Sequence, residues 1–270
     1  MSIGRIEATF KRLKQLGEAA LIPFVTAGDP SLERTEEIIH TLVDAGADLI
    51  ELGFPFSDPM ADGPTIQAAS ERALAAGTTL PGILQMVARV RRHTNVPIIL
   101  MGYYNPVFRY GAERFAKDAA AAGVDGLLLV DLPPEEAGEI HGFLRDAGVN
   151  LITLLSPTTP PERASRLAAS GEGFIYYVSM TGVTGARQVD AGGIETAVRE
   201  LKAFSPVPVA VGFGISTAAD ARSVGRFADA VVVGSALVKV IEAYGTSGEL
   251  LVQVGTFVRG LKSAVRGQAA

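Results

Sequence analysis

Residues 49–64 read LIELGFPFSDPMADGP, and this stretch decides how the rest of the chain is interpreted. Its first six residues form an apolar run that is typical of a buried strand, yet the run contains Glu51. A carboxylate that is buried without a partner costs free energy, so such a residue is expected to be paired or used. A loop rich in proline, glycine, serine and aspartate follows directly. The stretch therefore predicts a buried strand that carries an acid to its carboxyl end.

Seven further apolar runs resemble this one, and helical patterns follow all eight. We expect strands at residues 21–26, 48–54, 96–103, 126–131, 150–156, 173–179, 207–211 and 228–233. Helical patterns follow Ser31 as an N-cap and cover residues 65–76, 80–92, 112–122, 135–147, 161–169, 194–204, 217–224, 236–244 and 248–266. Several strands are apolar almost throughout, as in parallel sheets that are covered on both faces.

The pattern predicts an α/β fold, a (β/α)₈ TIM barrel with an additional N-terminal helix at residues 1–12, in a single domain over residues 1–270. The competing architecture is an open, doubly wound sheet. It is disfavoured because the first strand–helix turn lacks a G-x-G-x-x-G fingerprint, and because eight units fit a closed barrel.

Composition narrows the class of protein. The 270 residues include no cysteine, which excludes disulfides and thiolate metal sites. The net charge of −5 is spread along the chain without a basic block, which argues against nucleic acid as the main partner. No apolar run reaches the roughly 18 residues of a membrane span, and the N-terminus lacks the apolar centre of a signal peptide. We expect a cytoplasmic enzyme or binding protein.

Two glycine-containing loops predict a phosphate site. In α/β barrels the loops after strands seven and eight often bind phosphate through backbone N–H groups and helix N-termini. Here these loops are residues 212–216, GFGIS, and residues 234–236, GSA. The alternative is that the glycines make tight turns and the serines cap helices. The loop after strand six, residues 180–187, is rich in small residues and is expected to close over a ligand, or else to be an ordinary surface loop.

The acids of the opening stretch are candidates for proton transfer. Strand alternation places Leu49, Glu51 and Gly53 on one face, so Glu51 is expected to point into the barrel near its mouth. Burial there would raise its pKa, as a general acid–base requires. The alternative is a structural glutamate paired with an arginine. Asp58 and Asp62 lie in the following loop, where turn formation and helix entry would be enough to explain them.

The other polar residues give weaker indications of a function. The three histidines fall on predicted helices and are expected at the surface, and no cluster has the spacing of metal ligands. Strand six has no lysine, which argues against a Schiff-base mechanism on that strand. The remaining polar candidates at the mouth are Tyr103, Asn105, Asp131, and either Tyr176 or Tyr177.

Three motifs together resemble one family. The opening stretch continues through residues 62–67, DGPTIQ, and is joined by residues 182–185, GVTG, and by residues 212–216. The chain resembles the tryptophan synthase alpha chain family over essentially its whole length, including the N-terminal helix. The segment 51–67 is highly specific, whereas other phosphate-binding barrels share the glycine loops more loosely.

The resemblance implies a carbon–carbon lyase that cleaves indole-3-glycerol phosphate to indole and glyceraldehyde 3-phosphate. Glu51 matches the family's catalytic glutamate, which moves protons at indole C3 and at the glycerol hydroxyl. Asp62 matches the aspartate that accepts the indole N–H. Tyr176 matches the active-site tyrosine, and Thr184 matches a lid threonine that contacts the aspartate. The positions that match phosphate-binding residues are Gly185, Phe213, Gly214, Gly234 and Ser235, and Phe213 is also expected to wall the indole pocket.

The resemblance also implies a partner. The family pairs with a pyridoxal-phosphate beta chain in an alpha2beta2 heterotetramer, and the alpha chain itself is expected to hold no cofactor. The partner would face Pro55, Asp58 and Asn105. One departure is that Met180-Thr181 precedes Gly182, where many relatives carry a basic residue. The rival functions are a sugar-phosphate isomerase or epimerase on the same fold, and a barrel without activity that only activates a partner.

Overall fold

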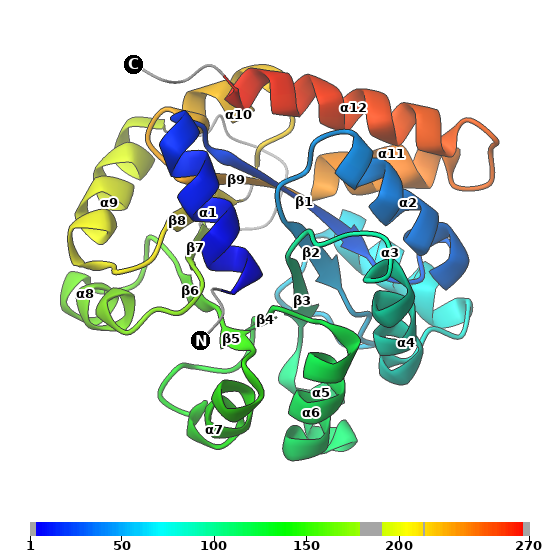
Figure 1. Ribbon diagram of the computed structural model, residues 1–270, viewed down its shortest axis with the longest axis horizontal. Coiled ribbons are helices and arrows are strands. Elements are labelled where there is room, and N and C mark those ends of the chain that lie inside the picture. Colours follow the sequence, from blue (N-terminus) through cyan, green and yellow to red (C-terminus); the bar gives the residue numbers. More distant parts are fainter. Residues whose placement is uncertain (1–3, 179–190, 213, 267–270) are drawn as a thin grey trace.

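The computed structural model describes residues 4–178, 191–212 and 214–266, in which parallel strands form a central ring inside helices (Figure 1). The strands are β1 (Ala20–Thr26), β2 (Ile50–Gly53), β3 (Ile98–Gly102), β4 (Gly126–Leu129), β5 (Asn150–Leu151), β6 (Thr153–Leu155), β7 (Ile175–Val178), β8 (Val209–Gly212) and β9 (Ala230–Val233). Their order is β5-β4-β3-β2-β1-β9-β8-β7-β6. Only Ile152 separates β5 from β6, so the two ends of this order meet within one chain segment and the barrel closes there.

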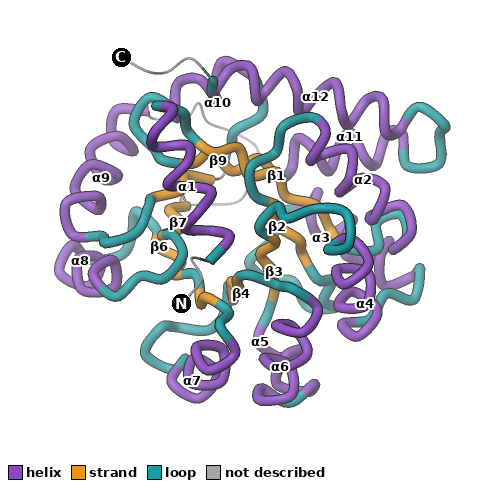
Figure 2. The backbone as a smooth tube through the Cα atoms, viewed as in Figure 1, coloured by secondary structure: helices purple, strands orange, loops and turns teal. Residues whose placement is uncertain are grey.

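Figure 2 shows the helices as an outer layer around the strands. They are α1 (Arg5–Leu16), α2 (Leu32–Asp44), α3 (Pro64–Ala75), α4 (Leu80–Val90), α5 (Tyr104–Tyr110), α6 (Ala112–Ala122), α7 (Gly138–Ala147), α8 (Pro161–Ala169), α9 (Ala191–Phe204), α10 (Ala218–Gly225), α11 (Ser235–Tyr244) and α12 (Leu250–Val265). The predicted barrel with an N-terminal helix is confirmed. α5 was not predicted, and the predicted fifth strand is interrupted at Ile152.

Alternation along the strands separates two apolar layers. On β2, Ile50 and Leu52 pack outward with the helices, whereas Leu49, directly before β2, packs inside the barrel. The α2 helix begins as predicted, since the Ser31 hydroxyl accepts the backbone N–H of Arg34 at 3.2 Å. Helices such as α2 cover the outer face of the sheet with their apolar side, where Ile38, Ile39 and Leu42 are buried.

The N-terminal helix closes one end of the barrel. On α1 the side chains of Ile6, Phe10 and Leu13 are buried in the same cluster as the inward-facing residues of the strands. The ring of Phe10 packs against Phe174, with centroids 6.0 Å apart, at the amino-terminal end of β7. Because this end is filled, the opposite end, where the strands finish, is the one left for a ligand.

No single helix in the described ranges is long and apolar enough to cross a membrane, and only α3 and α4 taken together, bent by 94°, pass that test by length and composition. Within the same ranges, no three His, Asp or Glu side chains gather as metal ligands would.

Candidate active site

Glu51 lies inside the barrel near the carboxyl end of β2. It pairs in register with Phe24 on β1 and Ile99 on β3, and its side chain is 2% exposed. Burial raises the pKa of Glu51 to about 8, so the carboxyl group is mainly protonated at neutral pH. Among the described residues its Oε1 atom has no hydrogen-bond partner, and Glu51 forms no ion pair. The structural alternative, a glutamate paired with an arginine, does not describe this residue.

Tyr176 faces the same interior. Of the two tyrosines on β7, Tyr176 packs with the residues inside the barrel and Tyr177 packs outward with the helices. Burial, and then the nearby charge of Glu51, raises the pKa of Tyr176 well above its ordinary value, so its hydroxyl stays protonated. The ring fits only because residue 212 is a glycine, since a Cβ there would collide with the tyrosine hydroxyl.

Asp62 is held in the loop between β2 and α3, and it does not cap the helix. The N-cap of α3 is Gly63, and no side chain in the described part of the chain caps that terminus. The Asp62 backbone is fixed from both sides: its N–H donates to the Pro59 carbonyl at 3.0 Å, and its carbonyl accepts the Gln67 amide at 2.8 Å. Helix entry therefore does not account for the carboxyl group.

Tyr103 connects Asp62 to β3. Its hydroxyl accepts the backbone N–H of Ala61 at 2.9 Å and also bonds the Asp62 carboxyl group. Burial raises the pKa of Asp62 to about 6, and the hydrogen bond from Tyr103 opposes that rise. At neutral pH Asp62 is thus mainly ionised, while Glu51 is mainly protonated. Two carboxyl groups with pKa values set apart by their environments are the usual arrangement for acid–base chemistry.

An apolar pocket lies beside Asp62 and Tyr103. Its free volume is ≈ 20 Å³, so a bicyclic ring can enter only if a wall moves, and the unbranched side chain of Met101 is well suited to move. Sequence reasoning missed Thr26, which lines this pocket and is buried. The signal was its place on the inward face of β1, two residues after Phe24. The lining residues are Phe24, Thr26, Gly53, Phe54, Asp62, Ile66, Ser70, Met101, Gly102, Tyr103 and Val130.

The two loops predicted to bind phosphate differ in whether their backbone N–H groups are free to bind an anion. In the loop before α10, the Asp220 carboxylate accepts the N–H groups of Ser216 and Thr217 at 3.1 and 2.9 Å and completes a capping box. By contrast, α11 begins at Ser235 after Gly234, and among the described residues no side chain caps it. The N-terminus of α11 therefore offers N–H groups and a positive dipole to an anion, and that of α10 is already occupied by the chain's own acid. Gly214 has a φ of +80°, which suits glycine.

Several predicted residues lie elsewhere. Thr184, Gly185 and Phe213 fall outside the described residues. Asp131 accepts the backbone N–H of Tyr104 at 2.8 Å and so holds the start of α5. The three histidines lie on or at the ends of outer helices, as predicted, where His40 packs edge-on against His93 and His141 contacts Glu172 at 2.8 Å.

The residues predicted to face a partner share one rim of the barrel mouth. Asp58 and Asn105 are exposed and Pro55 is half-buried. Pro55 and Asp58 lie in the loop after β2, and Asn105 lies in the first turn of α5, which follows β3. Two large apolar side chains, Met60 and Phe108, are 86% and 64% exposed beside them.

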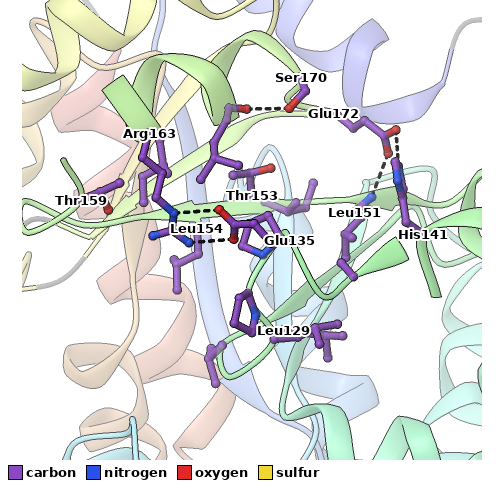
Figure 3. A pocket seen from close by; sticks show the side chains of 18 of the residues that line it. Leu129, Glu135, His141, Leu151, Thr153, Leu154, Thr159, Arg163, Ser170 and Glu172 are labelled. Atoms are coloured by element: carbon purple, nitrogen blue, oxygen red, sulfur yellow. Dashed lines mark hydrogen bonds and ion pairs between the residues drawn. The ribbon is translucent and has the colours of Figure 1, made fainter. Parts of the chain in front are cut away.

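A larger cavity, of ≈ 620 Å³, lies away from this mouth. It lies between α7 and α8 on the outer side of β4–β6 (Figure 3). Most of its charged groups are paired: Arg163 donates two hydrogen bonds of 2.9 Å to Glu135, and His141 contacts Glu172. Size alone would select this cavity, but the unpaired acid and the open helix terminus are at the barrel mouth, and they decide the location of the site.

Comparison with known proteins identifies the family. The family model for the tryptophan synthase alpha chain matches residues 10–266. The tryptophan synthase alpha chain of Citrifermentans bemidjiense is 59% identical over 263 residues, covering 97% of this chain and 98% of that one. The corresponding chain of Geobacter sulfurreducens is 55% identical, covering 97% and 99%.

Solved structures extend the likeness to three dimensions. Tryptophan synthase subunit alpha from Legionella pneumophila superposes with a TM-score of 0.90 at 41% identity, covering 98% of this chain and 99% of that one. A chain of Mycobacterium tuberculosis tryptophan synthase gives 0.89 at 35% identity, covering 98% and 99%. Fold, sequence and near-complete coverage agree, and this chain belongs to the tryptophan synthase alpha chain family, the lyases that cleave indole-3-glycerol phosphate in tryptophan biosynthesis.

Proposed function

We propose that Glu51 carries out the cleavage of indole-3-glycerol phosphate as a single acid–base group. The observation that supports this role is its burial without a partner, which keeps the carboxyl group protonated before reaction. In the first step Glu51 donates its proton to C3 of the indole ring. The resulting carboxylate then takes the proton of the glycerol hydroxyl next to C3, and the C–C bond breaks. The electrons of the broken bond return to the ring. Indole and glyceraldehyde 3-phosphate then leave, and Glu51 is protonated again.

Asp62 accepts the ring N–H in this proposal. Protonation at C3 places positive charge on the ring nitrogen, and an ionised carboxylate beside it stabilises that charge. The pKa of about 6 leaves Asp62 ionised at neutral pH, and Tyr103 orients it. Tyr176, kept neutral by burial, lines the space between Glu51 and the phosphate loops.

The phosphate is assigned to the open N-terminus of α11. Gly234 and Ser235 provide uncapped N–H groups there, and Gly214 lets the neighbouring loop approach closely. By resemblance alone, Gly185 and Phe213 complete the phosphate site and Thr184 closes over Asp62.

A beta chain is proposed as the partner, in an alpha2beta2 heterotetramer. The family's alpha chain uses no cofactor, and pyridoxal phosphate belongs to the beta chain. The rim with Pro55, Asp58 and Asn105 supports this assignment, because Met60 and Phe108 expose apolar surface beside these residues. We further assign the chain to the cytoplasm and treat residues 1–270 as one barrel domain.

The test is indole production from indole-3-glycerol phosphate by the purified chain, alone and with a beta chain. We expect release in both cases and faster release with the partner. Binding of indole propanol phosphate, compared with ribulose 5-phosphate, separates this function from a sugar-phosphate isomerase. No indole in either assay, together with tighter binding of the sugar phosphate, would contradict the proposal.

A further inference from the structure

The carboxyl end of β1 carries a second buried polar group, which the proton transfer proposed above does not use. Thr26 is 3% exposed, and within the described parts of the chain its Oγ1 and Glu51 Oε1 are the buried side-chain oxygens that lack a hydrogen-bond partner. An unpaired buried hydroxyl destabilises the folded chain, because it has lost its hydrogen bonds to water. A fold tolerates such a cost most readily where a ligand supplies the missing partner.

The surroundings of Thr26 indicate what that ligand atom is. Thr26 pairs in register with Gly53 and lines the pocket beside Asp62, whose other walls are mainly apolar, among them Phe24 and Met101. A flat apolar ring suits these walls, whereas a phosphate group suits the open terminus of α11. Indole has one polar atom, the ring N–H, and it can donate to a hydroxyl oxygen.

We propose that Thr26 determines specificity for the ring of the substrate, by accepting the ring N–H in a three-centre hydrogen bond that it shares with Asp62. The inference rests on the proposed function, because it places the indole half of the substrate in this pocket. The oxygen that is unpaired in the free chain becomes paired in the complex. As C3 gains a proton, the ring nitrogen becomes positive and its N–H becomes a stronger donor, so the bond strengthens in the transition state.

The first test is Thr26→Val, which keeps the shape of the side chain and removes the hydroxyl. We expect kcat/KM for indole-3-glycerol phosphate to fall about 10- to 100-fold, as for a lost hydrogen bond to a group that becomes charged. The Tm should not fall, since the free chain loses only an unpaired hydroxyl. Thr26→Ser, which keeps the hydroxyl, should retain most of the activity.

Thr35→Val is the matched control for stability. Thr35 is fully buried, but its hydroxyl accepts the Gly28 N–H at 2.9 Å and donates to the Ser31 carbonyl at 2.8 Å. The same substitution there should lower the Tm, because it leaves the Gly28 N–H without its partner. A Thr26→Val protein that loses Tm to the same extent, with unchanged kcat/KM, would make Thr26 a structural residue and overturn the proposal.

The second test compares indole with benzofuran, a ring of similar shape that has oxygen in place of N–H. The chain contains no tryptophan, so indole fluorescence reports binding without a protein background, and benzofuran is measured by displacement. The wild type should prefer indole, and Thr26→Val should lose part of that preference. An unchanged preference would overturn the proposal. Turnover by Glu51→Gln is measured separately, so failure of the acid–base assignment is distinguishable from failure at Thr26.

Discussion

Replacing Glu51 by glutamine should stabilise the fold at alkaline pH, because it removes a buried carboxyl group that must ionise there. Burial raises the pKa of Glu51 from 4.5 to about 8. Between these values the unfolded chain has lost this proton while the folded chain keeps it, so the free energy of unfolding of the wild type falls as pH rises. Above the folded pKa both states are ionised and the loss is complete. At about 1.4 kcal/mol per pKa unit, this pKa difference lowers the free energy of unfolding of the wild type by at most roughly 5 kcal/mol.

Urea unfolding of the wild type and Glu51→Gln at about pH 5, 7 and 9 measures this effect. The two proteins should be similar in stability at the lowest pH, and the advantage of the variant should grow with pH. Glu135→Gln is the control, because hydrogen bonding to Arg163 lowers the pKa of exposed Glu135 to about 2, and its removal should bring no gain as pH rises. A difference between wild type and Glu51→Gln that is independent of pH would refute a buried acid with a raised pKa.

Further predictions follow from the same geometry. kcat/KM should be bell-shaped with pH, falling below about 6, where Asp62 gains a proton, and above about 8, where Glu51 loses one, and a flat profile would contradict both assignments. Asp62→Asn should lower kcat/KM strongly and remove the fall of the pH profile below about 6. An unchanged kcat/KM would show that Asp62 has only a structural role in the loop. Gly212→Ala should lower both kcat and Tm, because its Cβ would collide with Tyr176, whereas Gly138→Ala, with open space around it, should change neither. Thermal unfolding and steady-state assays of the two alanine variants decide that comparison.

The barrel could be predicted because its strands are apolar on both faces and regularly spaced. The second strand was predicted too long, since Leu49 and Phe54 are as buried as the residues of β2 although they lie outside its bounds. The break at Ile152 and the short helix α5 were missed. Both depend on how neighbouring strands and loops meet, and local sequence patterns do not record such contacts.

The site was predictable where one residue broke a pattern. Glu51 stood out because a carboxyl group interrupted an apolar run. Asp62 was ambiguous in sequence, and only the position of Gly63 as N-cap removed the helix-entry explanation. Thr26 gave only a weak signal, its place on the inward face of β1, because a threonine at a strand end is common and its missing partner is a property of the folded pocket. Likewise, only the fold shows Asp220 occupying the N-terminus of α10.

The central claim is that Glu51 carries the proton in both directions, and turnover by Glu51→Gln tests it most directly. Indole release from indole-3-glycerol phosphate is measured for this variant and for the wild type, along with the binding of indole propanol phosphate to each. We predict that indole release is abolished while the ligand binds with nearly wild-type affinity, because glutamine keeps the shape and cannot transfer the proton. Near-normal indole release by the variant would contradict the account.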